Sequence, residues 1–177
     1  VQTCALPISM RTITSKLLGV VLLLSATMTF TGCSTVDDGE FTSPITLTEK
    51  ISGKWVVNSV VQTDEANART KTLTDLLNFD TFVINLNQDE AGKASTFTVE
   101  GNAPALLPAS GTWQMDYNFT KSDNTASRIL LNDGKAETVL TVTTVPGNTK
   151  TLEYRLTRKT KGQPFVSYTY NLTQAVK

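Results

Sequence analysis

Few side chains in this sequence could carry out chemistry, and most familiar reactions are excluded by residue type. The 177 residues include no His, two Cys, 16 basic and 16 acidic residues. Without His, neither a Ser-His-Asp triad, a Cys-His pair nor a His-ligated metal site can form. The balanced charge gives no general attraction to nucleic acid, so we expect no nucleic-acid partner.

Carboxylates are the remaining candidates for acid–base or calcium chemistry. Asp89 and Glu90 adjoin in a predicted turn, with no further acidic ligand nearby. Asp37, Asp38 and Glu40 also lack the spacing of a metal-binding loop. There is no phosphate-binding Gly-rich loop and no nucleophile with an identifiable base. We therefore expect no catalytic residue, no metal, no cofactor and no enzyme activity.

Residues 10–32 have the features of an export signal. Arg11 and Lys16 precede an apolar stretch over residues 17–30, which is short for a membrane span. Small residues then lead to Cys33, a pattern that resembles the lipobox of bacterial lipoproteins. The resemblance implies that Cys33 is lipidated and anchors the mature chain to a membrane. An ordinary secretory signal or a membrane anchor is the alternative.

The chain divides into four predicted parts. Residues 1–9 precede a credible start and are interpreted as a non-native extension, and residues 10–32 as a lipoprotein signal peptide. The lipidated Cys and a flexible tether occupy residues 33–45, and a folded domain occupies residues 46–177. Two of the 16 basic residues and no acidic residue lie before position 33, which leaves 14 against 16 and a net charge of about −2.

Two acidic residues in the predicted tether bear on where in the cell the protein is located. Asp37 and Asp38 follow Cys33 closely. In some Gram-negative lipoproteins an acidic pair at this place accompanies export to the cell surface, whereas a solvated spacer is the alternative. We expect a lipid-anchored protein at the outer membrane or cell surface of a Gram-negative bacterium.

Period-two patterns predict an all-β domain of eight strands joined by short turns, and therefore antiparallel neighbours. Thr46 and Glu49 form a capping box that predicts a short helix over about residues 47–52, and a second short helix is expected at 74–77. Eight meandering strands favour an up-and-down barrel, with a β-sandwich as the alternative. The predicted strands are residues 54–62, 81–87, 94–100, 112–117, 128–132, 137–145, 149–159 and 165–173.

Two Gly-x-Trp tripeptides suggest a family. Gly53 and Trp55 lie where the short helix meets the first strand. This resembles the first signature of lipocalins and of lipocalin-like bacterial lipoproteins, in which the Gly turns the chain and the Trp plugs one end of the barrel. Gly111 and Trp113 repeat the spacing, as in the lipocalin-like lipoproteins, which are largely uncharacterised. No Arg follows Arg158, whereas true lipocalins place an Arg after the last strand.

The predicted inward face is rich in aromatic residues. An eight-stranded barrel can be filled by side chains or can hold one small ligand, so these residues are candidates for ligand binding and, alternatively, for the core. We expect the protein to bind a small apolar or amphipathic ligand. Tyr168 and Tyr170 have the best claim, because a buried hydroxyl needs a partner. The candidates are Trp55, Phe82, Phe97, Trp113, Tyr154, Tyr168 and Tyr170.

The alternative function is a cell-surface module that recognises a glycan or a protein. Its barrel interior would be packed, and recognition would use the segments 64–80, 101–110 and 118–125. A basic stretch of Arg155, Arg158, Lys159 and Lys161 around the last predicted turn could meet an anionic partner or could form a solvated face.

We expect Cys33→Ser to release the protein from membranes, because two or more acyl chains hold a protein durably at a bilayer. Fractionation of cells into soluble and membrane pools measures the effect. Cys4→Ser, in the predicted extension, is the matched control and should leave the protein with the membranes. Membrane association that persists in Cys33→Ser would contradict the lipid anchor.

Overall fold

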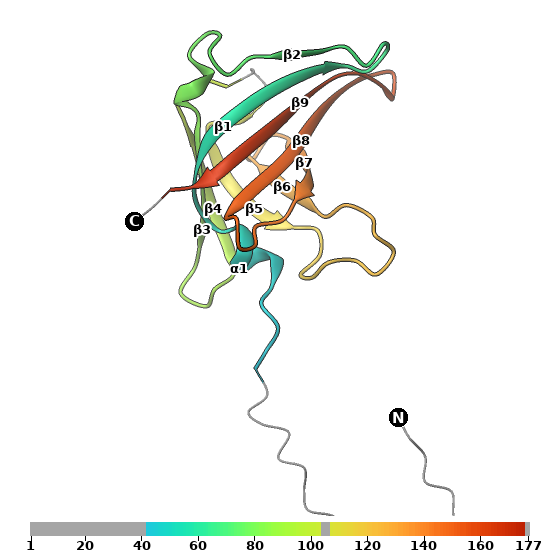
Figure 1. The fold of residues 1–177 in the computed structure, drawn as a ribbon. Helices are drawn as coiled ribbons and strands as arrows, with labels where there is room; N and C mark the ends of the chain where they lie inside the picture. Colours follow the sequence, from blue (N-terminus) through green and yellow to red (C-terminus); the bar gives the residue numbers. More distant parts are fainter. Residues whose placement is uncertain (1–41, 104–106, 176–177) are drawn as a thin grey trace, which may run out of the picture. The chain divides into compact units, whose positions relative to one another are not determined.

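The computed structural model describes residues 42–103 and 107–175 (Figure 1). The described residues from position 43 onward belong to one compact unit. The predicted extension, the signal peptide, Cys33 and most of the tether lie outside the described residues.

Within the described residues, nine antiparallel strands form one sheet, which closes into an eight-stranded barrel with one extra strand. The strands are β1 (Gly53–Asp64), β2 (Thr70–Thr72), β3 (Val83–Gln88), β4 (Ala94–Glu100), β5 (Ser110–Met115), β6 (Arg128–Asn132), β7 (Glu137–Thr144), β8 (Thr151–Thr160) and β9 (Gln163–Gln174). The order is β2-β1-β3-β4-β5-β6-β7-β8-β9, and pairing of β1 with β9 closes the barrel (Figure 1). The predicted all-β up-and-down barrel is therefore confirmed over its β-sandwich alternative.

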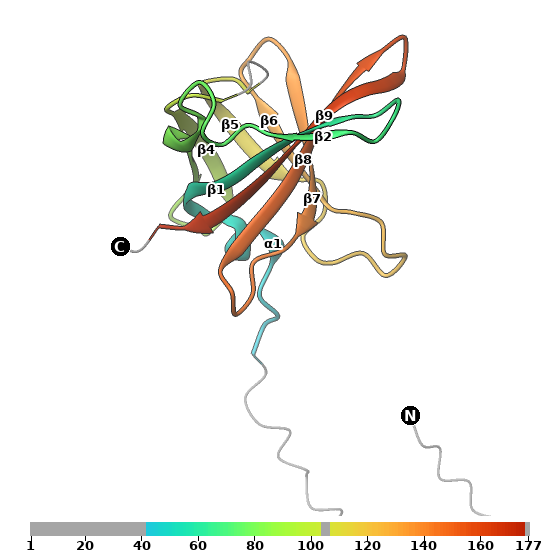
Figure 2. The same ribbon diagram turned by 45° about the horizontal axis from the view of Figure 1, so that its top comes forward.

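Strand β1 has three partners. Its first part, residues 53–56, pairs with β3, whereas residues 61–63 pair with the extra strand β2. Its other edge pairs with β9 from residue 55 to residue 64. Strand β2 therefore pairs with the same edge of β1 as β3 does, beyond the point where the pairing with β3 ends. We call this end of the barrel, shown facing forward in Figure 2, the mouth.

The interior follows the predicted alternation, with one change of phase in β1. A strict alternation from Trp55 predicts Ser59 and Val61 inside. Instead Val60 is fully buried, because the register with β9 shifts between Val57 and Ser59. Such a β-bulge adds one residue and moves the side chains that follow to the opposite face.

A short helix, α1 (Leu47–Ile51), lies at the end of the barrel opposite the mouth (Figure 1). We call this end the base. The predicted capping box is present: the Glu49 backbone N donates to Thr46 Oγ1 at 3.1 Å, and the Thr46 backbone N donates to the Glu49 carboxylate at 2.6 Å. The buried Trp55 indole Nε1 donates to the Ile51 carbonyl at 2.7 Å. Trp55 therefore fastens α1 to the core.

The predicted second helix over residues 74–77 is wrong. Turns occupy these residues, and a 3₁₀ helix, η1 (Phe79–Thr81), follows them. The Thr74 hydroxyl accepts a hydrogen bond from the β1 backbone at 3.0 Å, which ties the segment to the strand edge. Leu77 and Asn78 both have positive φ, 57° and 56°, and this geometry ends a right-handed helix.

We expect Trp55→Ala to lower the free energy of unfolding by about 3–5 kcal/mol, because it opens a cavity in the core and removes the bond to α1. Urea unfolding followed by circular dichroism measures the change. Tyr117→Ala, at a side chain that is mostly exposed, should shift it by less than about 0.5 kcal/mol. A loss below about 1 kcal/mol for Trp55→Ala would contradict its role as a plug.

Candidate functional site

The predicted ligand-binding residues come together in the barrel, but most of them are closed off from solvent. Six are buried and belong to one core cluster, and the seventh, Tyr168, is half-buried and packs against that cluster. The buried six are Trp55, Phe82, Phe97, Trp113, Tyr154 and Tyr170. In this arrangement the six pack as core, and Tyr168 alone reaches toward the surface.

Both tryptophans use their indole N–H groups within the protein. Trp113 Nε1 donates to the Asn87 carbonyl at 2.7 Å, just as Trp55 bonds to α1. Gly111 allows β5 to lie close to β6, because a Cβ at this position would be 2.0 Å from the Asn132 carbonyl oxygen. The second Gly-x-Trp tripeptide therefore serves packing.

Two buried tyrosines differ from the tryptophans in having unpaired polar groups. Tyr154 and Tyr170 stack with ring centroids 5.0 Å apart, and Phe82 lies 5.1 Å from Tyr170. Neither hydroxyl has a hydrogen-bond partner among the described residues. Burial, and after it a neighbouring tyrosine, raises the pKa of both hydroxyls, so both stay protonated at physiological pH.

A pocket of about 470 Å³ opens at the mouth, which we call the mouth pocket. One wall consists of Gln62, Lys71 and Tyr168, which are aligned in register on β1, β2 and β9. Gln62 follows the buried Val60 by two residues, so it lies on the same, inward face of β1. The facing wall is apolar and consists of Leu73, Leu76, Leu77 and Phe79.

Of the seven predicted ligand-binding residues, only Tyr168 lines the mouth pocket, whereas Lys71 and the facing wall lie within segment 64–80, which was predicted for the alternative recognition function. The facing wall comes from residues 73–79, which the sequence places in a recognition segment and, over 74–77, in a short helix, but not in the ligand pocket. The signal that could have identified them is an apolar run between two strands that lacks the period-two pattern. Leu76 and Leu77 of this run remain 41% and 78% exposed.

The predicted basic stretch is partly neutralised beside the mouth. Arg155 donates to Glu65, and also to the Ser167 hydroxyl at 2.8 Å, while that hydroxyl donates to Glu65. Hydrogen bonds from Ser167 and from Arg155 hold the pKa of Glu65 below its usual value. Further along β8, the Arg158 guanidinium lies 5.4 Å from the Phe165 ring centroid.

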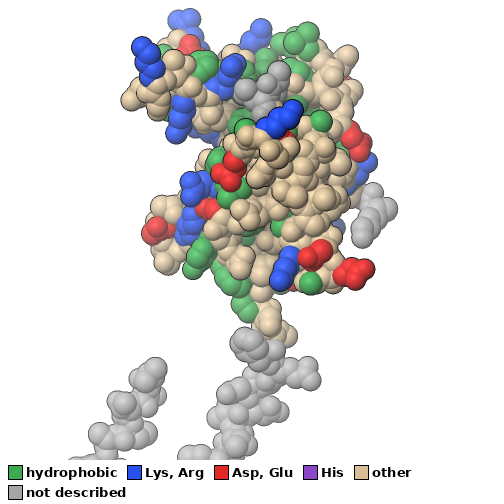
Figure 3. Space-filling model, turned by 180° about the vertical axis from the view of Figure 1, so that it is seen from behind, with side chains coloured by type: hydrophobic (Ala, Val, Ile, Leu, Met, Phe, Trp, Pro, Cys, Tyr) green, Lys and Arg blue, Asp and Glu red, His purple; other side chains and the backbone are tan. Residues whose placement is uncertain are grey.

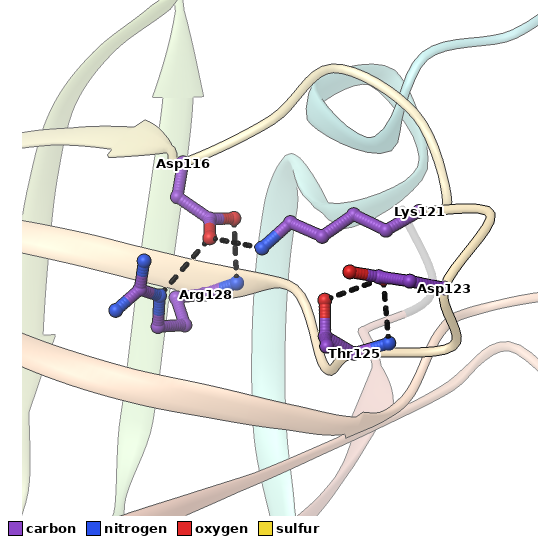
Figure 4. Close-up of polar contacts among 5 residues, drawn as sticks. All are labelled: Asp116, Lys121, Asp123, Thr125 and Arg128. Atoms are coloured by element: carbon purple, nitrogen blue, oxygen red, sulfur yellow. Dashed lines mark hydrogen bonds and ion pairs between the residues drawn. The ribbon is translucent and has the colours of Figure 1, made fainter.

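At the base, one carboxylate organises the loop between β5 and β6 (Figure 4). Asp116 accepts hydrogen bonds from the Arg128 backbone N at 2.8 Å, from Arg128 Nε at 3.0 Å and from Lys121 Nζ at 2.7 Å. Burial alone would raise the pKa of Asp116, but these bonds outweigh it and lower the pKa. Asp123 closes a turn by accepting from the Thr125 backbone N and hydroxyl.

These features define an antiparallel eight-stranded barrel with an aromatic core and an apolar pocket at its mouth. Residues 29–173 match the family described as Domain of unknown function (DUF5004), and the chain belongs to this family. Searches among curated proteins and among solved structures give no match. Over residues 42–103 and 107–175, no helix is long and apolar enough to cross a membrane.

We expect Tyr170→Phe to leave the free energy of unfolding unchanged or to raise it by up to about 1–3 kcal/mol, because the removed hydroxyl has no partner within the described residues. Tyr154→Phe should behave in the same way. Urea unfolding measures both, with Tyr117→Phe as the exposed control. A loss of more than about 1 kcal/mol would contradict the prediction and reveal a bound partner at the hydroxyl.

Proposed function

We propose that this protein is a lipid-anchored, lipocalin-like binding protein without catalytic activity, which holds a small amphipathic molecule in the mouth pocket. The mouth pocket carries the proposal. Its volume of about 470 Å³ falls within the range of about 300–1,000 Å³ that is typical of small-molecule sites. Apolar walls with a few polar groups are also typical of such sites.

The two walls favour an amphipathic ligand. The leucines and Phe79 offer apolar surface to a hydrocarbon chain. The opposite wall presents the Lys71 ammonium and the Gln62 amide, both able to donate hydrogen bonds to an acidic headgroup. A charge-assisted hydrogen bond of this kind is stronger than one between neutral groups. A carboxylate with a hydrocarbon tail therefore matches both walls.

The packed interior supports binding at the mouth rather than deep in the barrel. The six buried candidates and their aliphatic neighbours form one continuous core cluster. Tyr168 packs against that cluster and also lines the mouth pocket. Of the seven predicted ligand-binding residues, it is the one that a ligand at the mouth would touch.

The anchor and the location are proposed from the leader. Lipidation of Cys33 would hold the protein at the outer membrane or cell surface of a Gram-negative bacterium. The basic start, the apolar stretch and the small residues before Cys33 support this proposal.

A second candidate function is recognition of a glycan or protein by the surface of the barrel. It is favoured by the β8–β9 hairpin, which extends past the barrel in Figure 2. There Phe165 is 41% exposed, and the Arg158 guanidinium lies over its ring. Aromatic and Arg side chains dominate the binding energy of many interfaces.

Isothermal titration with dodecanoate tests the mouth pocket. We expect the protein without substitutions to bind dodecanoate. The affinity of Leu76→Asp should be lower by about tenfold or more, because an anionic side chain replaces an apolar contact at the pocket wall. Val139→Asp is the matched control, since Val139 on β7 is 37% exposed and Leu76 is 41% exposed. Equal affinity of both variants, or no binding at all, would count against the mouth pocket as the site.

A further inference from the structure

Three large apolar side chains are exposed together at the base. Ile45, Tyr117 and Phe119 are 63%, 56% and 42% exposed, and we call them the base patch. Their two segments lie side by side, because the Leu47 backbone N donates to the Asn118 carbonyl at 2.8 Å. Figure 3 shows hydrophobic side chains gathered at this end of the barrel, beside the point where the described chain begins.

The loop that presents the base patch is held in place before any partner binds. Asp116, whose side chain is 8% exposed, stands at the start of the loop just before Tyr117 and binds Lys121 in its middle and Arg128 at its end. Figure 4 shows these contacts on one side of the loop and the Asp123–Thr125 turn on the other. A surface that is already ordered loses less conformational entropy when it binds than a flexible one.

The proposed lipid anchor would bring a membrane within reach of this patch. Ile45 follows the predicted lipidation site, Cys33, by 12 residues. A fully extended segment of that length spans roughly 40 Å at 3.3–3.6 Å per residue. A short tether also keeps the base patch at a high effective concentration near the bilayer. A weak contact is then enough to hold the patch against the membrane surface.

The chemistry of the base patch fits the interface of a bilayer. Tyr carries an apolar ring with one polar end and is enriched at the level of the lipid headgroups. Lys121 and Arg128 share the single carboxylate of Asp116, so this cluster keeps one net positive charge near the headgroups. Apolar and aromatic burial would supply the contact with a neutral bilayer, and anionic lipids would add to it through this charge.

We propose that the base patch rests on the lipid bilayer and orients the barrel with its mouth away from the membrane. This inference rests on the lipid anchor of the proposed function. The orientation follows from β1, which begins next to α1 at the base and runs for 12 residues to the mouth. Gln62 of the mouth pocket lies nine residues after Gly53, or roughly 30 Å along the strand.

Site-specific fluorescence quenching tests the orientation. The full chain is expressed and processed as Phe119→Cys or Phe165→Cys, labelled with an environment-sensitive fluorophore and reconstituted in phosphatidylcholine vesicles with or without nitroxide-labelled lipid. Phe165 is the matched control, since it is 41% exposed and its carbonyl accepts from Glu65 at the mouth. In the processed chain Cys33 is lipidated through its sulfur, so the introduced thiol alone reacts.

We expect nitroxide lipid to quench the probe at position 119 at least twofold more than the probe at position 165. Equal quenching, or stronger quenching at 165, would overturn the orientation while the anchor stands. Protection of position 119 from aqueous iodide without lipid quenching would point to contact with a second copy of this chain and would also overturn it. Failure of both labelled proteins to float with the vesicles would reject the anchor itself, and the orientation with it.

Discussion

The pairing of β1 with β9 is the constraint on which the rest of the structure depends. It turns a meander into a closed barrel and satisfies backbone groups that an open edge would leave unpaired. Because β9 occupies one edge of β1, the other partners of β1 must all pair with its opposite edge. Because β3 pairs only with the first residues of β1, the remainder of that edge is free to bind β2 and the segment that forms the mouth pocket.

Most of the barrel could be predicted from sequence, because strand patterning and turn chemistry are local. Alternation marked the eight barrel strands, and the capping box of Thr46 and Glu49 marked α1. The extra strand could not be predicted, since β2 has three polar, exposed residues and its partner is set by the tertiary structure. The bulge near Ser59 was hidden for a related reason: it is visible only in the register with β9.

The candidate site was harder to predict than the fold. The sequence does not distinguish an inward aromatic side chain that packs in the core from one that lines a cavity. Phe97, which packs in the core, and Tyr168, which lines the mouth pocket, could therefore not be told apart. The run over residues 73–79 has the spacing of a helix, yet Thr74 bonds to β1 and Leu77 adopts a left-handed conformation. Bonds to a distant strand therefore decided the local structure.

The attachment of the mouth segment to β1 has a consequence for dynamics. The barrel strands are held on both edges, whereas β2 pairs along only three residues of β1. The segment after β2 is held by the bonds of Val60 to residues 73 and 74 and by the bond from the Asn102 side chain to the Leu77 carbonyl. Local opening free energies follow such differences, and weakly attached elements exchange with solvent first. We therefore expect the amides of β2 to exchange with solvent before those of the barrel strands, while the core residues Leu73 and Phe79 stay packed.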